Sequence, residues 1–165
     1  MKLTLWTGFW VFLLDQATKY LVVQVLDLRN LGRIDVLPPW LKLRMAWNTG
    51  VNFGLLADDA PLTRWLLIGI AMVISGAVLW WVRRNPGGVM QRLSAGLLVG
   101  GALGNVVDRL IYGAVADFLN MSCCGIANPY AFNVADITVF AGAFGLILFG
   151  DGTRAKSREG GGKAG

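Results

Sequence analysis

One uncharged apolar run constrains this chain more than any other feature. It extends from Trp65 to Val82 and contains 18 residues without an Asp, Glu, Lys or Arg. A helix of roughly 20 apolar residues crosses about 30 Å of hydrocarbon. The whole chain has 165 residues, of which 55% are hydrophobic and 15% charged, a balance atypical of a soluble domain. We therefore expect a membrane protein.

Three further segments are apolar enough to form membrane helices, and each carries one or two charged side chains. They are residues 3–26, 93–111 and 132–149. Together with the uncharged run (65–82), they predict an all-α membrane protein with four transmembrane helices in one domain, residues 1–150. The tail, residues 151–165, is rich in Gly and charge, so we expect it to be disordered.

The distribution of Lys and Arg favours one orientation, because basic residues near helix ends are retained in the cytoplasm. The start of the chain, the connector after the second helix and the tail hold Lys2, Arg83, Arg84, Arg92, Arg154, Lys156, Arg158 and Lys163. The loop 112–131 has no Lys or Arg. The first outer loop (27–64) is also basic, but it carries compensating Asp residues. We expect both termini to be cytoplasmic.

Within the first outer loop, the stretch WLKLRMAWN alternates apolar and basic residues after Pro38 and Pro39. This period of two predicts a half-buried strand. Two interpretations remain open. The apolar side rests on the bilayer while Lys42 and Arg44 face anionic head groups, or the strand packs on the protein.

The composition excludes several functions. The chain has no His, which removes Ser-His and Cys-His nucleophile pairs and His-ligated zinc. Cys123 and Cys124 are adjacent rather than spaced as metal ligands, and we expect no catalytic role for them. A Ser-Lys dyad would need a Ser near Lys19, but we expect Ser75 in the middle of its helix and Ser94 at the cytoplasmic end of its own. The net charge of +5 suits an anionic membrane better than nucleic acid, since no basic stretch is interleaved with base-stacking aromatics.

Carboxylates remain as the candidate chemical groups. Counting about 1.5 Å per residue from the cytoplasmic ends places Asp15, Asp108 and Asp136 at about 18, 22 and 20 Å. Asp117 follows Asp108 by nine residues and can fold back to the same level. An ionisable group at this depth costs at least about 2.5 kcal/mol, so each must face a partner or a watery cavity.

Helical spacing supplies some of those partners. Asp15 and Lys19 are four residues apart with the acid first, the better order for an ion pair. Asparagines share helix faces with the other charges: Asn105 with Asp108 and Arg109, and Asn133 with Asp136. Glycines repeat every fourth residue at positions 96, 100 and 104, which predicts close helix packing.

Two carboxylates in a low-dielectric site do not ionise together easily, so one keeps a proton while the other activates water. Such a pair hydrolyses a peptide bond, but spacing alone leaves the choice open among Asp15, Asp108, Asp117 and Asp136. Two other classes of function also remain open. Intramembrane charges mark ion-coupled transporters, and they specify helix pairing in assembly proteins.

Five motifs carry a resemblance to a known family. DQATK, NTGVNFG, GGALGNVVDR, GAVADF and FNVAD occur in the order and spacing of the conserved boxes of bacterial lipoprotein signal peptidase, the aspartyl signal peptidase II. The match extends to about residue 150. Asn52 departs from the family, which usually has a small residue there, and the loop SCCGIANPYA is not distinctive of it.

The resemblance implies a fold, a site and a substrate. The fold is four transmembrane helices with a small outer β-like cradle. The family motifs place the catalytic pair on Asp117 and Asp136, with supporting or substrate-binding roles for Asp15, Lys19, Asn48, Asn105, Asp108, Arg109 and Asn133.

The implied activity is removal of the signal peptide from prolipoproteins, with cleavage just before a Cys that bears diacylglyceryl. The implied location is the bacterial inner membrane, with the site near its outer face. No metal or organic cofactor is implied, membrane lipid surrounds the enzyme, and we expect a monomer.

Overall fold

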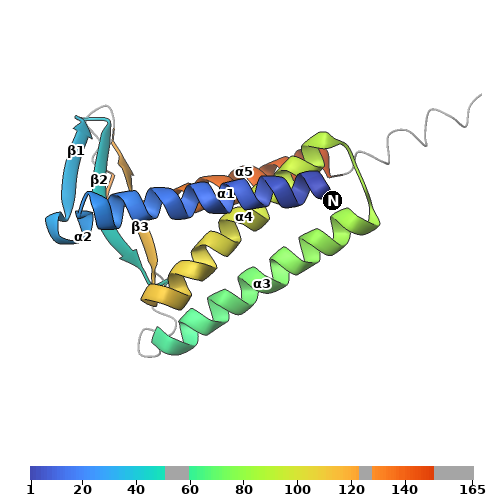
Figure 1. Cartoon of the computed structure of the whole chain (residues 1–165), viewed down its shortest axis with the longest axis horizontal. Coiled ribbons are helices and arrows are strands. Elements are labelled where there is room, and N and C mark those ends of the chain that lie inside the picture. Colours follow the sequence, from blue (N-terminus) through green and yellow to red (C-terminus); the bar gives the residue numbers. More distant parts are fainter. Residues whose placement is uncertain (51–59, 123–127, 151–165) are drawn as a thin grey trace, which may run out of the picture.

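The computed structural model describes residues 1–50, 60–122 and 128–150 (Figure 1). Its elements are α1 (Lys2–Tyr20), a π-helical turn η1 (Leu21–Val25), α2 (Leu28–Leu31), β1 (Arg33–Leu37), β2 (Leu41–Asn48), α3 (Ala60–Arg84), α4 (Val89–Tyr112), β3 (Val115–Met121) and α5 (Val134–Phe149). The predictions for Asn52, Cys123, Cys124 and the tail lie outside the described residues.

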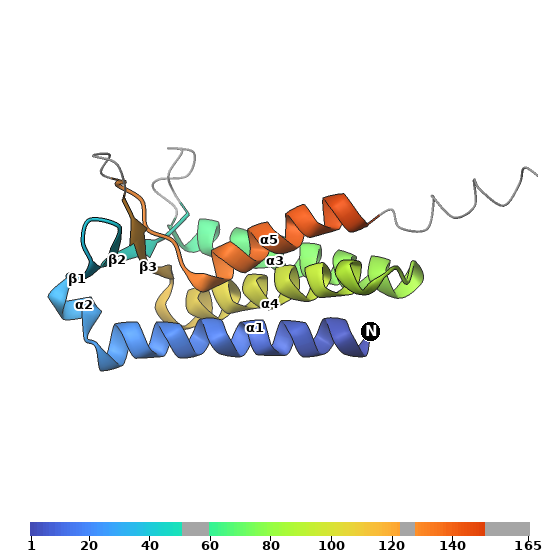
Figure 2. The same ribbon diagram turned by 90° about the horizontal axis from the view of Figure 1, so that it is seen from above.

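The long helices form a bundle, and the sheet lies at the end opposite the N-terminus (Figures 1 and 2). α4 packs against α1, α3 and α5. Its glycines allow the close approach to α1 that the sequence predicts. A Cβ at Gly96 would lie 2.7 Å from the Thr4 carbonyl oxygen, and one at Gly100 would lie 2.5 Å from that of Gly8. Larger residues at either position would push α1 away from α4.

By length and composition, two of the described helices are able to cross a membrane. Mean hydropathy reaches 2.2 in Pro61–Arg84 of α3 and 1.2 in Val89–Tyr112 of α4. α1 carries buried Asp15 and Lys19 among its 19 residues, and α5 has only 16, so the count of four transmembrane helices is not confirmed. The helical class and the small sheet are both as expected.

The sheet is antiparallel, with strand order β1-β2-β3. β2 coincides with the predicted strand, and Pro38 and Pro39 occupy the turn before it. β3 was not expected, because its residues lie in a segment interpreted as an outer loop. All but two of its side chains are buried, so VADFLNM lacks the alternation that reveals a half-buried strand.

The apolar side of β2 packs on the protein, which decides between the two interpretations of this strand. Leu43 is buried in a cluster with Val22, Leu28 and Phe118. This cluster joins η1 and α2, which follow α1, to the sheet. The bilayer surface is therefore not the partner of Leu43, while Arg44 on the other side of β2 is exposed.

Candidate active site

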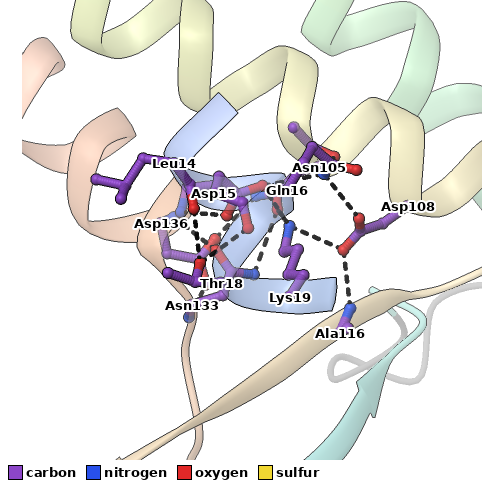
Figure 3. Close-up of polar contacts among 12 residues, drawn as sticks. Leu14, Asp15, Gln16, Thr18, Lys19, Asn105, Asp108, Ala116, Asn133 and Asp136 are labelled. Carbon is purple, nitrogen blue, oxygen red and sulfur yellow. Dashed lines mark hydrogen bonds and ion pairs between the residues drawn. The ribbon is translucent and has the colours of Figure 1, made fainter. Parts of the chain in front are cut away.

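Four elements bring most of the predicted polar residues together at the sheet end of the bundle, and β2 adds Asn48. α1 contributes Asp15 and Lys19, α4 contributes Asn105 and Asp108, and the N-terminus of α5 lies against both (Figure 3). β3 closes this cluster from the sheet side. The expectation that carboxylates from separate helices share one level is confirmed by their contacts.

Lys19 is the central cation of the cluster. Its Nζ atom lies 2.8 Å from an oxygen of Asp15 and 2.8 Å from an oxygen of Asp108, and it donates to Asn105 Oδ1 at 3.2 Å (Figure 3). Lys19 is 4% exposed, and both acids are at most 1% exposed. All three ammonium protons thus have acceptors, which is the condition for burying such a charge.

Asp15 and Asp108 also accept hydrogen bonds from backbone N–H groups in distant parts of the chain. Asp15 Oδ1 accepts from the Ala135 N–H at 2.9 Å, and Asp108 Oδ2 accepts from the Ala116 N–H at 3.1 Å. Ala135 and Ala116 each precede a residue of the proposed catalytic pair. Asp15 and Asp108 therefore fix the start of α5 and the course of β3. Gln16, which sequence reasoning missed, bridges them with bonds of 3.2 Å to each.

Asparagine side chains link Asp117 to Asp136. Asn133 Nδ2 donates to Asp117 Oδ1 at 2.6 Å and to Asn105 Oδ1 at 3.3 Å. Asn105 Nδ2 donates in turn to Asp136 Oδ1 at 2.9 Å. On the other side, Asn48 Nδ2 donates to Asp117 Oδ2 at 3.0 Å. Each oxygen of Asp117 thus has an amide donor.

The local sequence FNVAD explains where Asp136 lies. Asn133 caps α5: its side chain accepts from the Asp136 N–H at 2.9 Å, while Asp136 Oδ2 accepts from the Asn133 N–H at 3.3 Å. This reciprocal capping box places a carboxylate in the first turn, where the helix dipole favours negative charge. The same asparagine thus starts the helix and orients Asp117.

Asp117 is 3% exposed, and its ionisation reflects this burial. Burial raises the pKa of the Asp117 carboxyl to about 6, and the charge of nearby Asp136 contributes to the rise. The donors on Asn48 and Asn133 oppose it, because they stabilise the carboxylate. A carboxyl with this pKa gains and loses its proton near pH 6.

The remaining predicted residue, Arg109, joins the cluster through the backbone. Its guanidinium donates to the Asn105 carbonyl oxygen at 3.2 Å. All nine residues singled out from the sequence therefore belong to one connected group. The backbone N–H groups of Ala116 and Ala135 were missed, because no side-chain pattern signals them. In the part of the chain that the structure describes, no group of three or more His, Cys, Asp or Glu is arranged to hold a metal ion.

Comparisons with known proteins agree with the motifs. The family model described as Signal peptidase (SPase) II matches residues 7–150. A lipoprotein signal peptidase of Methylobacterium sp. (strain 4-46) is 44% identical over 135 residues, which are 82% of this chain and 80% of the relative. One from Vibrio cholerae serotype O1 is 39% identical over 153 residues, covering 92% and 87%.

A solved structure has a similar fold. It is described as a bacterial membrane enzyme determined by the in meso method at 1.9 Å resolution. Its TM-score is 0.76 at 25% identity, over 90% of this chain and 92% of that one. A second structure with the same description, at 2.3 Å, has a TM-score of 0.74 at 24% identity and covers 99% and 93%.

Proposed function

Because the chain belongs to the signal peptidase II family, we propose that it is an aspartic endopeptidase of the bacterial inner membrane with Asp117 and Asp136 as its catalytic pair. Its substrate is a prolipoprotein whose Cys bears diacylglyceryl, and the cut falls just before that Cys. The observation that carries this proposal is that Asn133 bonds both carboxylates: its side chain donates to Asp117 Oδ1 and its backbone N–H donates to Asp136 Oδ2, and burial raises the pKa of Asp117 to about 6.

The pair has the properties that peptide hydrolysis needs. In the active state it holds one proton between Asp117 and Asp136, and it titrates as a unit. The ionised carboxylate takes a proton from water, which attacks the scissile carbonyl. The protonated carboxyl polarises that carbonyl and then gives its proton to the leaving amine.

The surrounding asparagine amides donate hydrogen bonds to the carboxylates and take no part in proton transfer. Asn48, Asn105 and Asn133 fix the carboxylate oxygens without competing for the proton, because an amide is neither an acid nor a base near neutral pH. Lys19 supplies a positive charge that limits the cost of gathering carboxylates. Asp15 and Asp108 are structural, since their oxygens are already occupied by Lys19 and by backbone N–H groups.

We place the site near the outer face of the membrane. All four long helices cross the bilayer within one domain of residues 1–150, both termini are cytoplasmic, and the sheet lies at the outer surface. A lipid-modified Cys then presents the scissile bond just inside the head groups while its acyl chains stay in the bilayer. A monomer suffices for this, because one chain contributes all the residues of the site.

The test is cleavage of a purified prolipoprotein with and without diacylglyceryl on its Cys. Mass spectrometry of the products should show a mature fragment that begins with the lipid-modified Cys, and the unmodified substrate should be cut at least tenfold more slowly. Cleavage of both substrates at equal rates, or cleavage at another bond, would reject this specificity.

A further inference from the structure

A cationic pocket lies on the sheet, outside the proposed catalytic site. Its volume is about 410 Å³, within the range of small-molecule sites. Arg33, Lys42 and Arg44 supply its charges, and Met45 and Asn120 also line it. Arg33 lies in β1, Lys42 and Arg44 in β2 and Asn120 in β3, on the face opposite Leu43, whereas Met45 packs against the Leu43 cluster at the edge of the pocket.

The register of the strands concentrates positive charge there. Arg33 lies directly opposite Arg44, and Lys42 lies opposite Asp35. Like charges in opposed positions destabilise a sheet. The Arg33 guanidinium holds Asp35 through two bonds of 2.9 Å. Among the described residues, no carboxylate forms an ion pair with Lys42 or Arg44. The pocket therefore has an excess of about two positive charges, which a bound anion would relieve.

One wall of the pocket is rigid without any ligand. Asn120 is 4% exposed, and its side-chain amide donates to the carbonyl oxygens of Asn128 and Tyr130 at 2.8 Å each. The Ser122 hydroxyl accepts from the Asn128 N–H at 3.2 Å. These bonds fasten the segment before α5 to β3, so this wall of the pocket is held in place without a ligand.

Aromatic side chains place this pocket at head-group level. Trp47 and Tyr112 pack with ring centroids 5.4 Å apart at the junction of α4 and the sheet. Trp40, in the turn between β1 and β2, is 55% exposed, and Trp65, near the start of α3, is 58% exposed. Amphipathic rings gather where hydrocarbon meets water. Under the membrane placement proposed for the site, this level is the outer leaflet.

We propose that the Arg33, Lys42 and Arg44 pocket binds the phosphate of an anionic membrane phospholipid. A guanidinium offers paired donors to phosphate oxygens, and the Lys42 ammonium adds a point charge. Because β2 and β3 also carry Asn48 and Asp117, a bound lipid holds the proposed catalytic strand at the membrane surface.

The test compares lipid retention by native mass spectrometry of the full chain in detergent. Dioleoylphosphatidylglycerol and dioleoylphosphatidylcholine are the probes, since choline adds a cation that the pocket would repel. The wild-type protein should retain the glycerol lipid at least fivefold better. The double variant Lys42→Gln/Arg44→Gln should lose this preference, whereas Lys42→Arg/Arg44→Lys should keep it. Equal retention of both lipids by the wild-type protein would overturn the proposal.

A matched variant, Arg83→Gln/Arg84→Gln, removes the same charge at the other end of the bundle and should retain the preference. An equal loss in that variant would mean a general charge effect and reject the pocket. Glycerol phosphate at millimolar concentration should not displace the lipid; displacement would assign the pocket to soluble phosphates and reject a lipid occupant. Melting of each variant reports folding. No peptide is cleaved in this experiment, so its failure is separable from failure of the peptidase proposal.

Discussion

At the scale of single residues, asparagine amides hold both carboxylates of the proposed catalytic pair. Asn48 and Asn133 each donate to one oxygen of Asp117, and Asn105 donates to Asp136. The donors on Asp117 stabilise its ionised form, while burial and Asp136 favour its protonated form. The balance between them determines the pH range in which the pair holds one proton.

The first prediction concerns that pH range. The singly protonated pair is lost as pH rises through the Asp117 pKa, so kcat/KM of the wild-type enzyme should fall on the alkaline side with a midpoint near 6. Asn48→Ala removes a donor to the carboxylate and should move this midpoint upward. Asn30→Ala, which removes an exposed amide bonded to Asp27, should not move it. A midpoint that stays in place in Asn48→Ala would contradict the assignment.

The second prediction concerns stability. The folded-state pKa of Asp117 is raised above its ordinary value of 3.8, so the folded protein binds the extra proton between pH 3.8 and about 6. The stability that this proton contributes is present below pH 3.8 and is lost as pH rises through 6. Asp117→Asn does not titrate. Between pH 4 and 7 the wild-type protein should therefore lose up to about 3 kcal/mol of folding free energy relative to this variant. The melting temperature of the variant minus that of the wild-type protein should increase over the same range. A constant difference would show that Asp117 keeps its ordinary pKa.

At the scale of elements, α4 organises the site because it contacts every other long helix. Its glycines bring α1 close, and its polar end then meets the polar end of α1. Lys19, Asp15 and Asp108 tie these helices to α5 and β3 through backbone bonds. The positions of the site residues therefore depend on how closely α1 packs against α4.

The third prediction compares two glycines. Gly100→Ala places a methyl 2.5 Å from the Gly8 carbonyl oxygen, so it should cost about 1–3 kcal/mol of folding free energy. Gly76→Ala in α3 meets nothing within 4 Å and should be neutral or stabilising by up to about 1 kcal/mol, since Ala favours helix. Detergent melting measures both. Equal effects at the two positions would contradict the packing of α1 on α4.

The fourth prediction concerns the buried cation. Lys19→Met leaves Asp15 and Asp108 without their charged partner and should cost about 3–5 kcal/mol of folding free energy. Arg33→Met breaks an exposed pair with Asp35 and should cost no more than about 1 kcal/mol. If chemical denaturation gave similar losses for both variants, Lys19 would not be the centre of a buried network.

At the scale of the whole molecule, contacts between residues close in the sequence could be predicted, whereas contacts between distant segments could not. The pairing of Lys19 with Asp15 follows from a spacing of four residues, and the closeness of Asn133 to Asp136 follows from a spacing of three, although the role of Asn133 as the cap of α5 was not predicted. β3 could not be predicted, because burial on both faces removes alternation. The hydrogen bond from the Ala116 N–H to the Asp108 carboxylate depends on how β3 packs against the end of α4, and no local sequence pattern predicts that packing.

The central claim is that Asp117 and Asp136 act together on a peptide bond, and one measurement tests it most directly. Purified wild-type protein, Asp117→Asn, Asp136→Asn and the exposed control Asp27→Asn are compared for cleavage of a diacylglyceryl-modified prolipoprotein, with melting as the folding control. We expect both site variants to melt as folded proteins and to lose at least a thousandfold in rate, while Asp27→Asn cleaves normally. Cleavage at the wild-type rate by either folded site variant would contradict the account.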